Sequence, residues 1–227
     1  GGCGSRVKSA VIPKQFIEIG GVPVIVRTVR AFLAVEEIDM AYVGIKPDWH
    51  EYTDELFERF RIDKERIRVI DGGADRNGTV MNIAEAIVAE HGENEGDIIL
   101  THDAVRPFVT EKIIRDNISA MAKHSACGTY MPAADTIIRS DGEKVRETLN
   151  RSELYQAQTP QTFRLGDLRR NYYSLSEEQN KKLTDTCSVF TACNEDIYLV
   201  VGDALNFKIT TDSDLRMANA LAELSEK

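Results

Sequence analysis

Four stretches of the chain carry glycines, cations and hydroxyls that could bind a phosphorylated substrate. The first is Gly-Gly-Cys-Gly-Ser-Arg at residues 1–6, followed by Pro-Lys-Gln-Phe at residues 13–16. Glycines let the backbone point its N–H groups at phosphate oxygens from close by, and Arg6 and Lys14 add positive charge. Neither a Walker Lys-Ser/Thr pair nor a GxGxxG spacing is present here. We predict a triphosphate-binding turn, the simpler alternative being a glycine-rich terminus with two surface cations.

The second stretch is Thr-His-Asp-Ala-Val-Arg-Pro-Phe at residues 101–108, directly after the most apolar strand predicted in the chain. Ligands of open α/β sheets bind beyond the carboxyl ends of the strands. Asp103 could hold a divalent cation or a ligand hydroxyl there, and Arg106 could pair with a phosphate. A helix cap would explain Asp103 but not the cation beside it. We expect His102 to be a hydrogen-bonded structural residue rather than a general base.

The third stretch runs from Asp71 to Thr79, where glycines lead from a predicted strand into a predicted helix. Backbone groups at the start of a helix could hold a base or a ribose, although a plain turn would use the same residues. The fourth set is spread over the C-terminal half, and its hydroxyls and cations would suit a phosphorylated polyol. It includes Thr136, Arg151, Thr159, Thr184 and Lys208.

The elements that must position these residues alternate between short apolar runs and stretches of helical period. This alternation predicts an α/β fold with a mostly parallel central sheet and helices on both faces. We expect strands at 40–45, 67–70, 98–101, 128–131 and 197–201. We expect helices at 24–34, 52–60, 79–90, 112–123 and 212–226. The rhythm breaks at residues 133–163, which we predict to form a protruding β-arm within a single domain spanning residues 1–227.

Composition excludes several other classes of protein. With 28 Lys and Arg against 37 Asp and Glu, the net charge is −9, which argues against a nucleic-acid partner because such proteins need a broad basic face. The four cysteines lack zinc-ligand spacing and predict reduced thiols. No apolar run is long enough to span a membrane, and no signal peptide opens the chain. We therefore expect a cytoplasmic protein.

Taken together, these motifs resemble those of the sugar-alcohol-phosphate cytidylyltransferases. This family includes the methylerythritol 4-phosphate enzymes of isoprenoid synthesis and the ribitol 5-phosphate enzymes of teichoic-acid synthesis. The resemblance extends from Gly1 to about Ala220. It rests on Gly-Gly-x-Gly-Ser-Arg, Pro-Lys-Gln-Phe, Asp-Gly-Gly-x-x-Arg, His-Asp-Ala-Val-Arg-Pro, Gln-Thr-Pro-Gln-x-Phe and Phe-Lys-Ile-Thr-Thr-x-x-Asp-Leu, in this order. Ala74 departs from the pattern, because some relatives have an acidic residue there.

The resemblance implies a Rossmann-like nucleotide-diphospho-sugar transferase fold and a role for each matching residue. The catalytic residues would be Arg6, Lys14 and Lys208: Arg6 and Lys14 would hold the triphosphate and stabilise charge on its α-phosphate, and Lys208 would bind the polyol phosphate near both phosphates. Residues that would frame the cytosine and ribose are Gly1, Gly2, Gly73 and Thr79. Residues that would bind the acceptor are Asp103, Arg106, Thr136, Arg151, Thr159 and Thr184, with Asp103 also a ligand to Mg²⁺. The arm would form a homodimer.

The implied reaction joins CMP from CTP to a small polyol phosphate and releases pyrophosphate. Similarity at residues 155–159 and 172–187 favours ribitol 5-phosphate as the acceptor, with 2-C-methyl-D-erythritol 4-phosphate as the alternative. An alternative hypothesis, from a different class of function, is a regulatory protein that binds CTP without turnover. Retention of the cations in all of these motifs argues against that reading.

Overall fold

The computed structural model describes residues 12–225 of the chain. The predicted triphosphate turn, with Gly1, Gly2 and Arg6, lies outside the described residues. The strands are β1 (Glu18–Ile19), β2 (Val22–Pro23), β3 (Ala41–Ile45), β4 (Ile67–Asp71), β5 (Ile98–Thr101), β6 (Ala126–Pro132), β7 (Ile138–Ser140), β8 (Val145–Thr148), β9 (Tyr155–Arg164) and β10 (Tyr198–Val201).

The α-helices are α1 (Val24–Leu33), α2 (His50–Arg59), α3 (Arg76–His91), α4 (Glu111–Ala120), α5 (Leu165–Ser174), α6 (Glu177–Asn180), α7 (Cys187–Ala192) and α8 (Asp212–Ser225). Short 3-10 turns lie at η1 (Lys14–Phe16), η2 (Pro47–Trp49), η3 (Lys64–Arg66) and η4 (Arg151–Glu153). None of the helices between residues 12 and 225 has the length and apolar composition needed to cross a bilayer.

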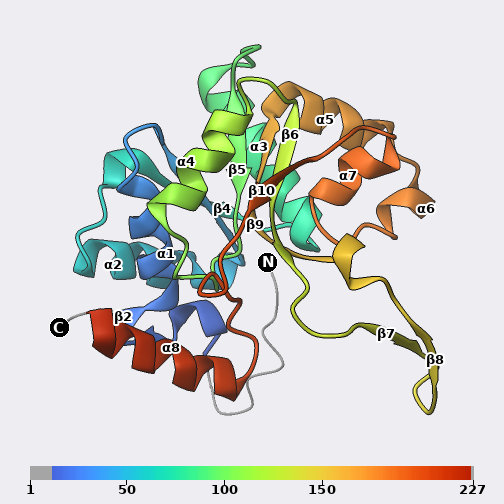
Figure 1. The fold of residues 1–227 in the computed structure, drawn as a ribbon. Helices are drawn as coiled ribbons and strands as arrows, with labels where there is room; N and C mark the ends of the chain where they lie inside the picture. The colour runs from blue at the N-terminus through green and yellow to red at the C-terminus, as the bar shows by residue number, and fades with distance from the viewer. Residues whose placement is uncertain (1–11, 226–227) are drawn as a thin grey trace.

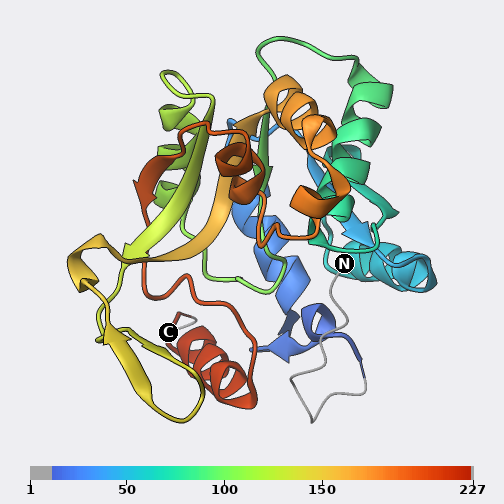
Figure 2. The same cartoon turned by 90° about the vertical axis from the view of Figure 1, so that its right-hand side faces the viewer.

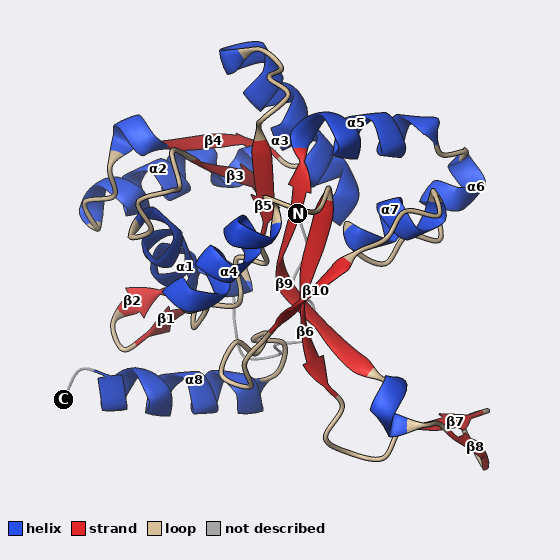
Figure 3. Ribbon diagram, turned by 45° about the horizontal axis from the view of Figure 1, so that its top comes forward, coloured by secondary structure: helices blue, strands red, loops and turns tan. Residues whose placement is uncertain are grey.

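The largest sheet is mixed rather than mostly parallel, which corrects the sequence prediction. Its strand order is β10-β6-β9-β5. These four strands lie at the centre of the molecule (Figures 1 and 3). β10 runs parallel to β6, whereas β9 runs antiparallel to both β6 and β5. The parallel pair β3-β4 forms a separate small sheet. The protein therefore has a mixed α/β fold in which β9, an inner strand of the sheet, runs opposite to the other three strands.

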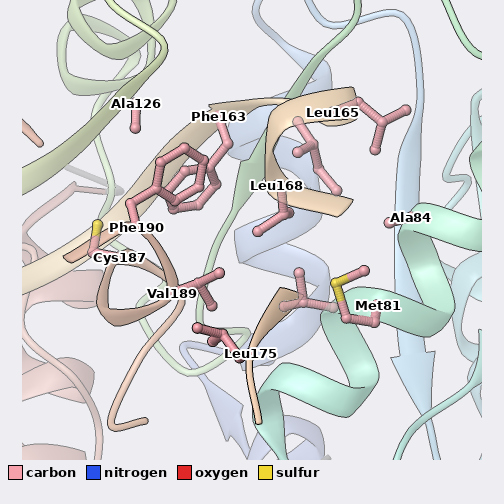
Figure 4. Packing of buried hydrophobic residues seen from close by; sticks show 12 residues of the cluster. Met81, Ala84, Ala126, Phe163, Leu165, Leu168, Leu175, Cys187, Val189 and Phe190 are labelled. Carbon is pink, nitrogen blue, oxygen red and sulfur yellow. The ribbon is translucent and has the colours of Figure 1, made fainter. Parts of the chain in front are cut away.

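Helices cover both faces of this sheet, as the sequence predicts. Ala126 and Cys127 are neighbours in β6 and point to opposite faces. Ala126 packs in a cluster with residues of α3, α5 and α7. Cys127 packs on the other face against Met121, the residue that follows α4. In the first cluster the rings of Phe163 and Phe190 stack with centroids 4.9 Å apart (Figure 4).

The segment predicted as an arm, residues 133–163, contains two different parts. The hairpin β7-β8 projects from the body of the protein, and all of its strand residues are exposed (Figures 1 and 2). Residues 155–163 belong instead to β9, the longest strand of the main sheet.

A groove of about 1140 Å³ lies between β3 and β5. Its inner part is apolar, with Val29 and Phe32 of α1, Val43 of β3 and Ile99 of β5 among the lining residues. Asp39 and Asp97 line the groove near the amino ends of β3 and β5, and its mostly cationic polar end lies beyond the carboxyl ends of the same strands. The charged side chains that line this end include Lys14, Arg76, Asp103 and Lys208. The groove thus joins four segments that are far apart in the sequence.

Candidate active site

Asp103 is the centre of a cluster of cations at the polar end of the groove. Its carboxylate Oδ1 accepts a hydrogen bond from Nε of Arg76 at 3.2 Å. Its Oδ2 lies 3.2 Å from Nε of Arg106 and 3.0 Å from Nζ of Lys208. Three cations from separate parts of the chain therefore share one carboxylate, whose side chain is only 12% exposed.

This arrangement keeps Asp103 ionised and leaves the cluster positive. Burial alone would raise the pKa of Asp103, but the charges of Arg76, Lys208 and Arg106 outweigh it and hold that pKa well below its usual value. Burial also lowers the pKa of Arg106, against the opposing effect of Asp103. One negative charge among three positive ones leaves an excess of positive charge, which suits a polyanionic ligand such as a phosphate ester.

Two loops hold Arg106 and Lys208 beside Asp103. The loop after β5 carries Asp103 and Arg106, and the loop after β10 carries Asn206 and Lys208. Nη1 of Arg106 donates to the carbonyl oxygen of Asn206 at 2.8 Å. The backbone N–H of Ile209 donates to the carbonyl of Val105 at 2.9 Å. One side-chain and one backbone hydrogen bond therefore join the two loops.

His102 and Thr159 fix the start of the loop that carries Asp103. Nε2 of His102 lies 3.1 Å from the carbonyl oxygen of Arg106, which can only accept, so Nε2 carries the proton. Nδ1 then accepts from the hydroxyl of Thr159 at 2.9 Å. The same hydroxyl accepts from the backbone N–H of Asp103 at 3.1 Å. His102 is thus a hydrogen-bonded structural residue, as expected from the sequence. Thr159 supports Asp103 by accepting a hydrogen bond from its backbone N–H.

The environment of His102 predicts a pH dependence of stability. Burial lowers the pKa of His102 to about 4, below the value of about 6.5 that is usual in an unfolded chain. Between these values the unfolded chain binds more protons, so the free energy of unfolding falls as pH falls from 6.5 to 4. The loss is at most about 3 kcal/mol.

A non-titrating variant isolates this effect. We expect His102→Gln, measured by urea unfolding at several pH values, to lack this part of the decrease. The difference between wild type and variant cancels the other titrating groups. Parallel pH profiles for the two proteins would contradict the assignment.

Lys14 enters the same groove from a different element. It lies in the 3-10 turn η1, its side chain is largely buried, and its Nζ donates to the carbonyl oxygen of Thr210 at 2.7 Å. Thr210 follows Lys208 by two residues, and both line the groove with Lys14. Lys14, the cation predicted to bind the triphosphate, therefore contacts the loop that carries Lys208, which is also predicted to bind phosphate.

The turn between β4 and α3 is tightly packed against the start of α3. A Cβ on Gly73 would lie 2.3 Å from the carbonyl carbon of Gly78, so no larger residue fits there. The N–H of Gly73 donates to the hydroxyl of Thr79 at 2.9 Å. Asp75 caps α3 by accepting from the N–H of Gly78 at 2.7 Å. Thr79 is buried and lines the groove, and it follows Arg76 of the cation cluster by three residues in α3.

Three predicted acceptor residues lie apart from the cluster. Thr136 and Arg151 are exposed at the base of the arm, where Nη1 of Arg151 donates to the carbonyl of Ala134 at 2.8 Å. Thr184 is exposed in the loop before α7, next to Asp185. Among the described residues that line the groove, none of these three is found.

Arg76 is a site residue that the sequence prediction did not assign a role. It ends the motif Asp-Gly-Gly-x-x-Arg and begins α3. The motif was visible in the sequence, but only the pairing of Arg76 with Asp103 across the groove gives the arginine a place in the site.

The described residues do not form a protein cage for a metal ion. No three side chains of His, Cys, Asp or Glu come together as a metal-binding group within residues 12–225. Asp103 is the carboxylate of the cluster, and three cations already contact it. A divalent ion bound here would take most of its ligands from a phosphorylated substrate, with at most Asp103 from this part of the protein.

Comparison with known proteins decides the family. The family model for IspD, 2-C-methyl-D-erythritol 4-phosphate cytidylyltransferase, matches residues 1–223. The chain belongs to this family. IspD enzymes are cytidylyltransferases, so the protein is a nucleotidyltransferase, in agreement with the resemblance seen in its motifs.

Solved structures of IspD enzymes have the same fold. The 4-diphosphocytidyl-2C-methyl-D-erythritol synthase of Anaerococcus prevotii is 31% identical, with a TM-score of 0.79 over 91% of this chain and 88% of that one. The 2-C-methyl-D-erythritol 4-phosphate cytidylyltransferase of Francisella tularensis is 28% identical, with a TM-score of 0.79 over 92% and 93% of the two chains. The enzyme of Thermus thermophilus is 26% identical, with a TM-score of 0.76 over 93% and 94%.

These comparisons correct the predicted acceptor. The family model and these three relatives are methylerythritol phosphate enzymes, which supports the alternative reading of the sequence. The preference for ribitol 5-phosphate, and with it a role in teichoic-acid synthesis, is not supported. It rested on short similarities at 155–159 and 172–187. In the structure Gln158 and Thr159 of the first stretch are buried in β9, so their sequence reflects packing within the sheet as well as ligand contact.

Proposed function

We propose that the protein transfers CMP from CTP to 2-C-methyl-D-erythritol 4-phosphate, giving 4-diphosphocytidyl-2-C-methyl-D-erythritol and pyrophosphate. The observation that carries the proposal is the cluster around Asp103, where Lys14, Arg76 and Lys208 line the same end of one groove. Two phosphorylated substrates repel each other, and a concentrated positive site allows them to bind side by side. Family membership supports the choice of these two substrates.

In this mechanism an oxygen of the acceptor's phosphate monoester attacks the α-phosphorus of CTP in line. A new P–O bond forms at the α-phosphorus, and the bond to the β-phosphate oxygen breaks, so that pyrophosphate leaves with the electron pair. The nucleophile is already ionised near neutral pH, so no general base is required. Both ring nitrogens of His102 are already hydrogen-bonded, to Arg106 and Thr159, which is consistent with a reaction that needs no general base.

The cations do the main work by binding and charge neutralisation. We assign Lys14 and Lys208, together with Arg6, to the triphosphate, where they stabilise the charge that grows on the phosphoryl oxygens. Gly73 and Thr79, with Gly1 and Gly2, bind the base and ribose. Asp103, Arg106 and Thr159 form the acceptor side within the cluster, on which Thr159 acts by supporting Asp103. Thr184, which does not line the groove, would contact the acceptor from the exposed loop before α7.

We also propose that Mg²⁺ takes part, bound mainly by the triphosphate. A magnesium ion prefers oxygen ligands and commonly uses substrate phosphates with only one or two carboxylates, a pattern that a single Asp103 fits. When bound, the ion would neutralise charge on the phosphates.

The exposed arm leads us to propose a homodimer in which Thr136 and Arg151 serve the partner's site. An isolated two-stranded hairpin is marginally stable in water, and Val145 of β8 is 63% exposed.

We expect Val145→Asp to convert a dimer into a monomer in size-exclusion chromatography with light scattering. Leu224→Asp in α8, where the side chain is 69% exposed, is the matched control and should leave the dimer intact. A monomeric wild type would contradict the proposal.

Pyrophosphate release with different acceptors tests the proposed reaction. The protein is incubated with CTP, Mg²⁺ and either 2-C-methyl-D-erythritol 4-phosphate or ribitol 5-phosphate. We expect release with the first acceptor and much less with the second. CTP binding without release from either acceptor would instead identify a non-catalytic nucleotide-binding protein.

A further inference from the structure

Arg76 bridges two parts of the site that belong to different elements. It is the first residue of α3, immediately after the turn that contains Gly73. Nε of Arg76 donates to Oδ1 of Asp103 at 3.2 Å, and its Nη1 donates to the hydroxyl of Thr186 at 2.6 Å. One guanidinium therefore contacts both the loop after β5 and the loop before α7.

The neighbouring residue strengthens the second of these contacts. The hydroxyl of Thr186 accepts from Arg76 and directs its own proton to Oδ1 of Asn77 at 3.3 Å. Nδ2 of Asn77 donates to the carbonyl oxygen of Asp185 at 3.3 Å. Two successive residues at the start of α3 thus bind two successive residues of the loop 183–187, and Thr186 is almost completely buried.

The sheet holds the same loop from its other side. Oε1 of Gln161, in β9, accepts from the backbone N–H of Thr186 at 3.1 Å and from that of Cys187 at 3.3 Å. Nε2 of Gln161 donates to the carboxylate of Asp185. The loop 183–187 is therefore held between β9 and the start of α3, and its contacts with α3 connect it to the turn between β4 and α3.

We propose that Arg76 is a positioning residue that couples the nucleotide-binding turn to the acceptor side of the site. It orients the carboxylate of Asp103 and the loop that carries Thr184 from a single rigid group at the start of α3. The direction of the effect on each substrate rests on the proposed function. The mechanical part, that Arg76 holds the loop 183–187, rests on the hydrogen bonds alone.

The geometry requires arginine rather than any cation. A guanidinium is planar and donates in fixed directions, so Nε and Nη1 can serve two acceptors at once. A lysine at the same position keeps the charge but has one nitrogen on a flexible stem. Arg76→Lys therefore separates the bridging geometry from the charge, and Arg76→Gln removes both.

Steady-state kinetics test the coupling. We expect Arg76→Lys to raise KM for the acceptor about tenfold while KM for CTP changes by less than about threefold, because bidentate contacts carry the positioning. Arg76→Gln should raise the acceptor KM further. Arg169→Lys is the matched control, because Arg169 also bridges two side chains, Glu85 and Glu93, but does not line the groove. It should leave both KM values within about twofold.

Hydrogen exchange without substrate keeps the inference testable even if the wild type proves inactive. We expect faster amide exchange at Thr186 and Cys187 in both Arg76 variants than in wild type, with unchanged exchange in β6. Inactive wild type with faster loop exchange in the variants would overturn the proposed reaction and leave the positioning role in place. Wild-type exchange in the loop, or a wild-type acceptor KM in an active Arg76→Lys enzyme, would overturn the inference.

Discussion

Replacing Lys14 by alanine is expected to lower kcat for pyrophosphate release by about 10² or more. The side chain of Lys14 is only 8% exposed and borders the groove beside Lys208 and Thr210. A positive charge in such a site acts on the charge that develops on the phosphoryl group, and its loss raises the barrier by about 3 kcal/mol. Steady-state assays with saturating CTP and acceptor measure the effect directly.

Two further variants show whether the charge itself is responsible. Lys14→Arg keeps the charge and should retain more activity than Lys14→Ala. Lys112→Ala removes a lysine whose side chain is 81% exposed and which pairs with Asp116, so it should behave like wild type. Circular dichroism checks that each variant folds. A Lys14→Ala enzyme within a factor of three of wild type would exclude Lys14 from catalysis.

Asp103→Asn is expected to destabilise the protein without ligand by about 3 kcal/mol, with a large loss of activity. Asp103 is the shared anion of Arg76, Arg106 and Lys208, and asparagine cannot neutralise them. Removing one member of a buried ion pair leaves its partners uncompensated, which costs more than the pair itself contributes. Because the pKa of Asp103 is lowered, we expect this contribution to persist throughout the neutral pH range and to be lost only in strong acid.

Added anions distinguish this explanation from a general folding defect. Pyrophosphate should raise the melting temperature of Asp103→Asn more than that of wild type, because it supplies negative charge to the unpaired cations. Asp116→Asn is the matched control, an exposed partner of Lys112, and should change stability by less than about 0.5 kcal/mol. Equal stabilisation of all three proteins by pyrophosphate would show that the cluster does not depend on Asp103.

The sequence predicted the positions of the chemistry better than the path of the sheet. Asp103 and Arg106 follow an apolar strand, and a strand end is where a parallel α/β fold places its ligands. That rule holds at β5, although its neighbour β9 runs antiparallel. Lys14 and Lys208 were expected in the same site from their motifs, and the structure brings both to one groove.

β9 escaped prediction because its buried residues are polar. Gln158, Thr159, Gln161 and Thr162 are buried in the strand, where side-chain hydrogen bonds replace apolar contacts. Strands are predicted from an alternation or a run of apolar residues, so a strand whose buried residues are polar resembles an irregular segment. The partners of Arg76 were hidden for a related reason, since Asp103 and Thr186 are distant in sequence and meet only through the fold.

The central place of β9 has a consequence for how the protein becomes active as it folds. β5 pairs with residues 161–164 and β6 with residues 155–163, so insertion of β9 closes long loops of chain. Contacts between distant segments form slowly, whereas helices such as α1 and α3 can form early. Asp103 receives its support from Thr159 only after that insertion. During refolding from denaturant, helical signal should therefore return before enzymatic activity, and recovery of activity should report the completion of the sheet.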